Sequence, residues 1–291
     1  MKHNYTHIDP EPDNGNPQHD FFRRTDIPYA KSSEEVWAEL DKKLNETPQT
    51  RISNFKFQKT FFAIAASIIL LAGIFSIIRF YTTTVYSPAG QHLSHVLPDG
   101  SIVKLNAESE ITYKSLWWRF VREVEFEGEA YFEVEKGKKF SVTSSMGTTE
   151  VLGTSFNIFS RGEEYNVTCI TGQVKVISTT LQEVILTPEY EARVSADGSI
   201  LVANEMKSGM SHSWISNMFH FAARPLPLVL NEISRQYNIT ITSDIILDYS
   251  YTGYFSKERT AEEVLDFVCK PFGLTFARIS ENEYEIYQSP D

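Results

Sequence analysis

A continuous apolar run at residues 61–78 (FFAIAASIILLAGIFSII) constrains this chain more than any other feature. It contains no charged residue and lies between Lys59 and Arg79. At about 1.5 Å of rise per residue, a helix of this length nearly spans a hydrocarbon core of roughly 30 Å, and flanking residues extend it. We therefore predict a transmembrane helix over residues 60–81. A cleavable signal peptide is excluded because about sixty mostly polar residues precede the run.

Basic residues beside this helix predict its orientation. Five of them precede it closely: Lys42, Lys43, Arg51, Lys56 and Lys59. On the other side Arg79 stands alone until Lys104. The positive-inside bias therefore places the N-terminus in the cytoplasm and about 210 residues outside. We predict a single-pass bacterial inner-membrane protein with a periplasmic C-terminus.

The negative charge of the chain is concentrated after residue 60. Residues 1–60 carry nine Lys/Arg and ten Asp/Glu, whereas the rest carries 18 Lys/Arg and 28 Asp/Glu, a net charge of −10. Such an acidic surface repels the nucleic-acid backbone, so we exclude direct nucleic-acid binding. The two cysteines, Cys169 and Cys269, fall in separate predicted domains. We expect two small buried hydrophobic residues, although a periplasmic disulfide is permitted.

Residues 1–59 form the predicted cytoplasmic arm, with one amphipathic helix at about residues 33–46. Ser32 and Glu35 have the spacing of a capping box. The apolar residues that follow share one stripe: Val36, Trp37, Leu40 and Leu44. A single helix of about fourteen residues cannot bury such a stripe, so it requires the membrane surface or another protein. The stripe has one aromatic residue and no basic girdle, which favours a protein groove.

Residues 86–195 show the pattern of many short strands. The LPDGS segment at residues 97–101 predicts a tight turn with Gly100 in a left-handed conformation. Apolar and polar residues alternate in VEFEGEAYFEV (124–134) and in LGTSFNI (152–158). This spacing predicts a β-sandwich or jelly-roll-like domain. Four acidic residues alternate along one predicted strand and indicate a solvated face: Glu123, Glu125, Glu127 and Glu129.

The same segment offers little catalytic chemistry. His92 and His95 form an H-x-x-H pair without a third ligand at metal spacing, so surface histidines are favoured. The GTSF segment at residues 153–156 lacks the second glycine of a G-x-S-x-G nucleophile elbow. We find no phosphate-binding glycine loop. We therefore expect no active site, no metal and no cofactor.

The pattern changes after a predicted linker at residues 196–213. Residues 214–291 predict a small α+β domain with the element order β-α-β-β-α-β-β. PLPLVLNEISRQY (225–237) has the apolar spacing of its first helix, and Thr260 with Glu263 forms a capping box before the second. The predicted fold class is mainly β: a cytoplasmic helical arm, one transmembrane helix, a β-sandwich or jelly-roll-like domain, and this α+β domain.

Three ordered segments carry a specific resemblance. They are LPDGSIVKLNAESEITY (97–113), FEGEAYFEVEKGKKFSV (126–142) and VLGTSFNIF (151–159). With the membrane helix before them, they resemble the FecR-type anti-sigma factor family. One departure is Glu189, because the family usually has glycine after the proline at this position. Residues 214–291 are similar to the C-terminal domain of Bacteroidetes members, which resembles the signalling domain of TonB-dependent outer-membrane transporters.

The resemblance implies a transmembrane regulator of transcription by cell-surface signalling. The arm helix, through Val36, Trp37, Leu40 and Leu44, would bind an extracytoplasmic-function sigma factor. The periplasmic part would read the signalling domain of a TonB-dependent transporter, and an intramembrane protease would release the arm. Some family members are thought to cleave themselves at a Gly-Thr bond, which corresponds here to Gly153 and Thr154. An ordinary strand glycine at Gly153 is the favoured interpretation.

Two other classes of protein stay open at this stage. A membrane-anchored carbohydrate-binding or scaffolding protein would use Trp117 and Trp118 as an exposed aromatic platform. Packing of this pair in a core or an interface is at least as compatible with the sequence. The binding protein would also leave the arm helix without a use. A jelly-roll enzyme ranks third because metal ligands are missing from the pattern.

Overall fold

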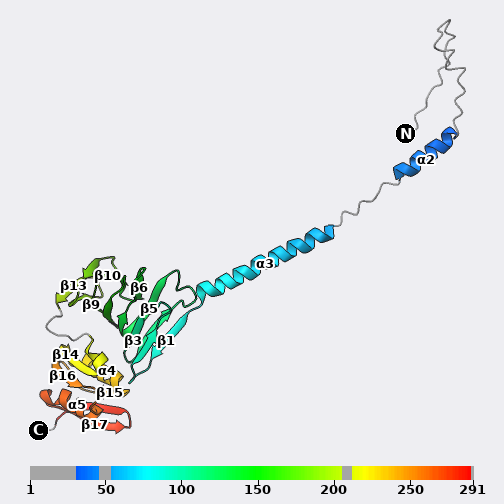
Figure 1. Ribbon diagram of the computed structural model, residues 1–291. Helices are drawn as coiled ribbons and strands as arrows, with labels where there is room; N and C mark the ends of the chain where they lie inside the picture. The colour runs from blue at the N-terminus through cyan, green and yellow to red at the C-terminus, as the bar shows by residue number, and fades with distance from the viewer. Residues whose placement is uncertain (1–30, 46–53, 205–211, 290–291) are drawn as a thin grey trace, which may run out of the picture. The chain divides into compact units, whose positions relative to one another are not determined.

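The computed structural model describes residues 31–45, 54–204 and 212–289, without the side chains of residues 54–58 (Figure 1). Residues 1–30 and 46–53 of the predicted arm and residues 205–211 of the predicted linker lie outside the described residues. The chain divides into two compact units, Met1–Ala66 and Ser67–Asp291. Each is described by itself below.

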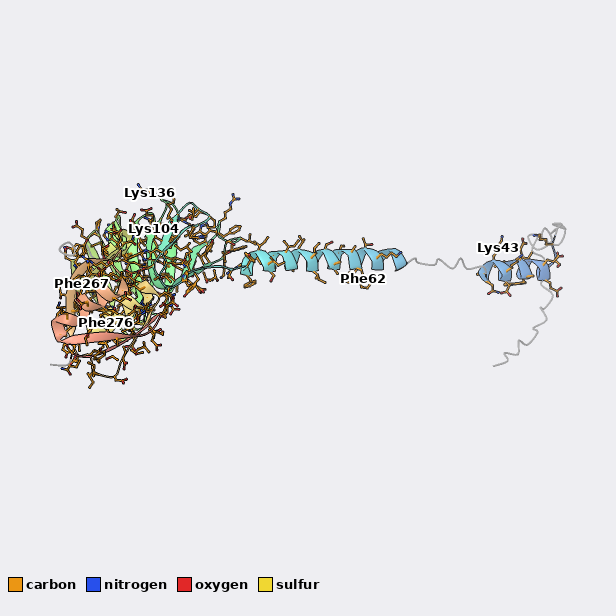
Figure 2. All side chains as sticks on the ribbon, turned by 90° about the horizontal axis from the view of Figure 1, so that it is seen from below. Lys43, Phe62, Lys104, Lys136, Phe267 and Phe276 are labelled. Carbon is orange, nitrogen blue, oxygen red and sulfur yellow. The ribbon has the colours of Figure 1, made fainter. Side chains whose placement is uncertain are left out.

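In the described residues, two helices precede the β-rich part. Helix α2 covers Ser33–Asn45 and α3 covers Asn54–Phe80. Among the described residues, one segment is long and apolar enough to cross a membrane, Lys59–Phe80 in α3, and none of it is buried. Its apolar side chains, such as Phe62, project into the surroundings (Figure 2). This surface suits lipid and not water.

The β-rich domain that follows α3 has thirteen strands in the described residues. They are β1 (Thr83–Ser87), β2 (Leu93–Val96), β3 (Ile102–Leu105), β4 (Ser109–Tyr113), β5 (Arg122–Glu133), β6 (Phe140–Ser144), β7 (Gly147–Val151), β8 (Ser155–Arg161), β9 (Glu164–Thr171), β10 (Val174–Ser178), β11 (Glu183–Leu186), β12 (Tyr190–Val194) and β13 (Ile200–Asn204). The predicted mainly β fold class is confirmed. Strand β13 lies within residues 196–213, which the sequence predicts as a linker. This corrects the prediction: the turn at Gly198 (φ 79°) reverses the chain, so that β13 pairs with β12.

Strand β5 joins two sheets. Residues 122–127 pair with β4 and, in parallel, with β6, whereas residues 128–133 pair with β3 and β8. The change occurs at Gly128, whose φ is 112°. A Cβ there would lie 2.6 Å from the Cα of Ser109, so only glycine fits. One sheet continues through β7, β10 and β11, and the other through β9, β12 and β13.

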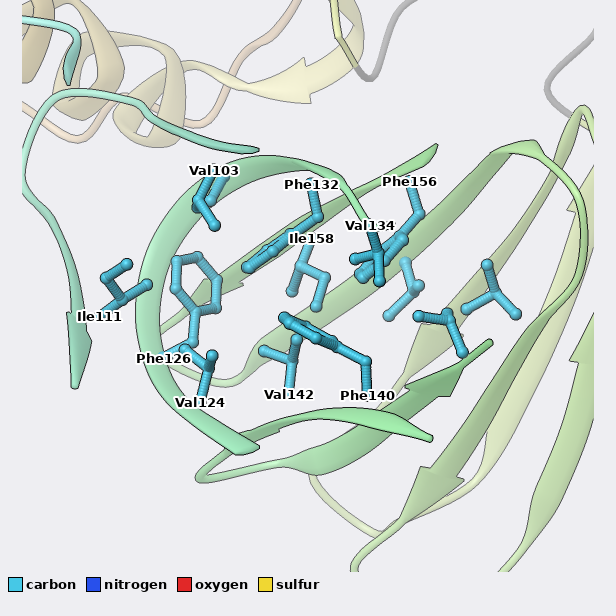
Figure 3. Close-up of a cluster of buried hydrophobic side chains, with 14 of the residues drawn as sticks. Val103, Ile111, Val124, Phe126, Phe132, Val134, Phe140, Val142, Phe156 and Ile158 are labelled. Atoms are coloured by element: carbon cyan, nitrogen blue, oxygen red, sulfur yellow. The ribbon is translucent and has the colours of Figure 1, made fainter. Parts of the chain in front are cut away.

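The core of this domain lies where the two halves of β5 face each other. Apolar residues of β5 are buried and alternate with exposed or half-buried polar ones, as the sequence predicts. Phe132 stacks on Phe156 with 5.0 Å between ring centroids, and Phe126 meets Phe132 edge to face. Figure 3 shows these rings and Phe140 enclosed by the curving strands. Cys169 is buried in the same core.

Two turns follow from residue chemistry. The predicted turn at residues 97–101 closes the β2–β3 hairpin, with Gly100 at φ 88° and its amide donating to Leu97 O. Asp99 accepts from the Ser101 amide and forms an ion pair with Arg122. Glu189 also lies at positive φ (74°), where the resembling family usually has glycine. The backbone at Glu189 therefore keeps the left-handed conformation that glycine would adopt, although a residue with a Cβ disfavours it.

The C-terminal domain has the predicted order β14-α4-β15-β16-α5-β17-β18. The elements are a short helix η1 (Ser213–Ser216), β14 (Met218–Pro225), α4 (Leu226–Tyr237), β15 (Thr240–Ser243), β16 (Ser250–Ser256), α5 (Ala261–Cys269), η2 (Lys270–Phe272), β17 (Leu274–Ser280) and β18 (Glu283–Gln288). β14 pairs with β16, and β18 lies between β15 and β17. The predicted capping box of α5 is present, since Thr260 and Glu263 exchange hydrogen bonds. Both helices bury their apolar faces in one core, which includes Cys269.

Candidate functional site

The arm helix α2 presents an apolar stripe. Trp37 is 71% exposed, Leu40 45% and Leu44 66%, with Val36 beside them, and no residue of α2 is buried. The helix begins where predicted: the Ser32 amide donates to Glu35 and the Glu35 amide to Ser32 Oγ. Glu34 and Glu35 in its first turn and Lys42 and Lys43 in its last suit the helix dipole. Local sequence therefore stabilises α2, and no described part of the chain buries its stripe.

A second candidate lies where the β-rich domain meets α4. Six residues form an interdomain polar cluster: Asn106, Glu129, Asn157, Trp214, Glu232 and Gln236. Asn106 and Asn157 donate to the two carboxylate oxygens of Glu129 at 2.8 and 3.1 Å. Trp214 Nε1 donates to Asn157 at 3.1 Å, and Gln236 donates to Asn106 at 2.6 Å. These bonds join residues up to 130 positions apart.

Helix α4 supplies one side of the cluster from consecutive turns. Gln236 Nε2 donates to Glu232 at 2.8 Å, and Arg235 forms an ion pair with Glu232 at the same distance. The Arg235 carbonyl accepts from the Gly90 amide at 2.7 Å, and Gln236 Oε1 pairs with His92 Nε2 at 3.0 Å. The loop after β1 is therefore held against the end of α4.

Burial changes the acidity of this cluster. Burial, reinforced by the charge of Glu232, raises the pKa of Glu129 to about 7. Burial opposes ionisation of Glu232 as well, but Arg235 and Arg161 outweigh it and lower the pKa of Glu232. Burial and the charge of Lys257 lower the pKa of His92. One carboxylate of the pair is thus held ionised, whereas the other takes up a proton near neutral pH.

Glu129 corrects one sequence prediction. Glu123, Glu125 and Glu127 are exposed, as expected of a solvated face, but Glu129 is half-buried, bonded to Asn106 and Asn157, beside Glu232 of α4. The alternation along β5 is right, yet a single strand cannot indicate which part of its polar face another domain covers. The sequence carried no local signal for this contact.

A cavity of about 580 Å³ adjoins the cluster. Its lining combines carboxylates with apolar and cationic groups, among them Glu129, Glu164, Phe159 and Arg224. Arg224 forms an ion pair with Glu164 at 2.7 Å and lies over the Phe159 ring. Within the described part of the chain, no group of three or more His, Cys, Asp and Glu residues is arranged to hold a metal ion. The cluster and the cavity therefore lie at the contact between the β-rich domain and α4.

Comparison with known proteins decides the family. The FecR protein family model matches residues 83–175, and the FecR C-terminal model matches residues 218–286. The chain belongs to the FecR family. Two crystal structures of a "putative anti-sigma factor" from Parabacteroides distasonis ATCC 8503 are similar, with TM-scores of 0.66 and 0.65 and identities of 28% and 27%. The match to each structure covers 72% of this chain and the full length of the crystallised chain. No curated protein matches the chain.

The Gly153–Thr154 bond of this FecR-family chain lies in a bend before β8. The predicted strand began earlier, at Leu152, but Gly153 has φ 148° and Leu152 is exposed. A Cβ on Gly153 would lie 2.7 Å from the Cα of Lys136, so close packing requires glycine here. Thr154 is buried, and its Oγ1 has no hydrogen-bond partner among the described residues. The bond therefore combines an unusual backbone with an unassisted hydroxyl.

The remaining predicted candidates have structural partners. His95 pairs with the Tyr113 hydroxyl at 2.8 Å, and His92 belongs to the α4 contact described above. Trp118 is buried against Tyr113 and Phe140, whereas Trp117 is half-buried. The two tryptophans therefore do not form one exposed platform, because the chain turns between them.

Proposed function

We propose that this FecR-family protein is a transmembrane anti-sigma factor whose helix α2 binds an extracytoplasmic-function sigma factor. The observation that carries the proposal is the exposed apolar stripe of Val36, Trp37, Leu40 and Leu44. Family membership and the likeness to a crystallised "putative anti-sigma factor" support the same role.

The physical argument concerns what the stripe requires. A helix of 13 residues is marginal in water by itself, although its capping box and charges favour the helical state. Burial of Trp37 and the two leucines in a groove would stabilise the helix and the complex together. Trp37 is the expected anchor, since tryptophan is enriched among residues that dominate binding energy.

The outer part would supply the signal. We propose that α3 crosses the inner membrane with the N-terminus in the cytoplasm and the C-terminus in the periplasm, in line with the flanking basic residues. The periplasmic domains would then read the signalling domain of a TonB-dependent transporter. Cleavage within or near α3 by an intramembrane protease would release the arm with its sigma factor.

A transcription reporter tests this function in cells. Deletion of residues 1–50, or Trp37→Ala/Leu40→Ala in the full chain, should leave transcription unresponsive to the transporter's substrate. Lys42→Ala, on the opposite face of α2, is the matched control and should keep the response. A membrane-anchored carbohydrate-binding protein would tolerate the deletion, so a normal response after deletion would refute the anti-sigma role.

A further inference from the structure

An exposed apolar loop lies beside the end of α3. Residues 114–121 (KSLWWRFV) connect β4 to β5, and we refer to them as the 114–121 loop. Leu116 is 51% exposed, Phe120 64% and Val121 46%. On a soluble surface, a cluster of this kind marks an interaction site.

The fold explains why the loop reaches α3. Strand β1 begins at Thr83, directly after α3, and pairs antiparallel with β4, so that Thr83 lies opposite Tyr113 at the end of β4. Thr83 Oγ1 also donates to Ser115 Oγ at 2.9 Å. The loop therefore leaves β4 at the point where α3 enters the domain, which Figure 1 shows as the junction of α3 with β1.

Trp117 contacts α3 directly. Its ring meets the Phe75 ring edge to face at 5.8 Å between centroids, and the Arg79 guanidinium lies 5.3 Å from its centroid. Phe120 packs on Trp117 at 4.4 Å. Phe75 precedes the end of the membrane segment by five residues, or about 7.5 Å along a helix axis. A ring that touches Phe75 therefore lies within the membrane interface if α3 spans the bilayer.

Other contacts of the 114–121 loop fix the position of Trp117 beside α3. Trp118 is buried in the domain core, which fixes the loop from within. Amides of Phe120 and Val121 donate to the Trp117 carbonyl, so the loop is tightly turned. No acidic residue occurs between Glu110 and Glu123, whereas Lys114, Arg119 and Arg122 do, in a part of the chain that is otherwise acidic.

We propose that the 114–121 loop inserts into the surface of the same membrane that α3 spans. Phe120, Leu116 and Val121 would enter the headgroup and upper acyl region, with Lys114 and Arg119 beside lipid phosphates. Trp117 would occupy the level at which tryptophan collects in membrane proteins. This docking rests on the proposed transmembrane role of α3, and it fixes the orientation of the outer domains on the bilayer.

Site-specific quenching in the full-length chain tests the proposal. The chain is reconstituted in vesicles of phosphatidylethanolamine and phosphatidylglycerol, and a fluorophore is attached to Phe120→Cys or, independently, to Leu116→Cys. Cys169 and Cys269 are buried with raised thiol pKa values, so they label poorly, and unsubstituted protein measures their background. Ile246→Cys is the exposed control in the C-terminal domain, and Leu70→Cys reports on α3.

The expected result separates lipid from water. Labels at Phe120 and Leu116 should lose most of their fluorescence to doxyl-labelled lipid and little to aqueous iodide, whereas Ile246 should show the reverse. Iodide quenching of both loop labels, or protection from both quenchers by a protein neighbour, would overturn the docking loop. Doxyl quenching at Leu70 in the same vesicles distinguishes these outcomes from failure of α3 to span the membrane.

Discussion

The interdomain polar cluster gives a quantitative prediction about pH. Glu129 has an ordinary pKa of 4.5 in water, and burial beside Glu232 raises the pKa of Glu129 to about 7 in the folded protein. The folded state therefore holds a proton that the unfolded state releases between these values. Glu129→Gln removes this titration while it keeps the size and polarity of the side chain.

The sign and the size follow from proton linkage. Because the folded-state pKa is the higher one, the free energy of unfolding of the wild type falls as pH rises from about 4.5 to about 7. At about 1.4 kcal/mol per pH unit, the wild type should lose roughly 2.5 kcal/mol relative to Glu129→Gln between about pH 5 and about pH 8. The loss of one hydrogen bond in the variant adds a cost of about 1 kcal/mol that does not depend on pH.

Other titratable groups near Glu129 also change stability with pH, so the wild type must be compared with Glu129→Gln at each pH. The lowered pKa of His92 decreases stability as pH falls below 6.5, and the lowered pKa of Glu232 does so only below 4.5. The effect of His92 on stability therefore opposes that of Glu129 in the same pH range. His92 is present in both the wild type and Glu129→Gln, so its effect cancels in the difference between them. Urea unfolding of residues 82–291, followed by tryptophan fluorescence at several pH values, measures the difference directly. The crystallised relatives match 72% of this chain over their full length, which supports the use of this fragment.

The result that would refute this reasoning is a constant difference. If the two unfolding free energies differ by the same amount at about pH 5 and about pH 8, Glu129 titrates at its ordinary value. Water would then reach Glu129, and the contact between α4 and the β-rich domain would be open in solution.

Three further substitutions test the fold and one chemical possibility. Phe132→Ala leaves a cavity between Phe126 and Phe156 and should lower the free energy of unfolding by about 3–5 kcal/mol in urea titrations; a cost under about 1 kcal/mol would contradict the packing. Glu189→Gly relieves a left-handed backbone and should raise stability by up to about 1 kcal/mol in the same assay, and a loss would refute the turn. Because Thr154 Oγ1 has no basic partner among the described residues, we expect intact wild-type protein on a denaturing gel; two fragments that Thr154→Ala abolishes would establish self-cleavage after Gly153.

Features with a local physical cause could be predicted from the sequence. The long apolar helix α3 follows from an uncharged run, and α2 and α5 follow from capping boxes before apolar stripes. The burial pattern of β5 follows from its alternation. The turn at Gly100 follows from residues that favour a left-handed position.

Features that depend on distant contacts could not be predicted. Glu129 has the same local pattern as Glu127, but Asn106, Asn157 and α4, all distant in sequence, make its surroundings differ. The bend at Gly153 depends on close packing against Lys136, which the alternation around it does not reveal. Trp117 and Trp118 are adjacent in sequence, but one contacts α3 and the other the core.

The most direct test of the anti-sigma role is co-purification from the native cell. The tagged full-length chain is extracted in mild detergent, and bound proteins are identified by mass spectrometry for wild type, Lys42→Ala and Trp37→Ala/Leu40→Ala. We predict that wild type and Lys42→Ala retain a sigma factor and that the double variant loses it. Absence of a sigma factor from the wild type, or equal capture by all three chains, would contradict the account.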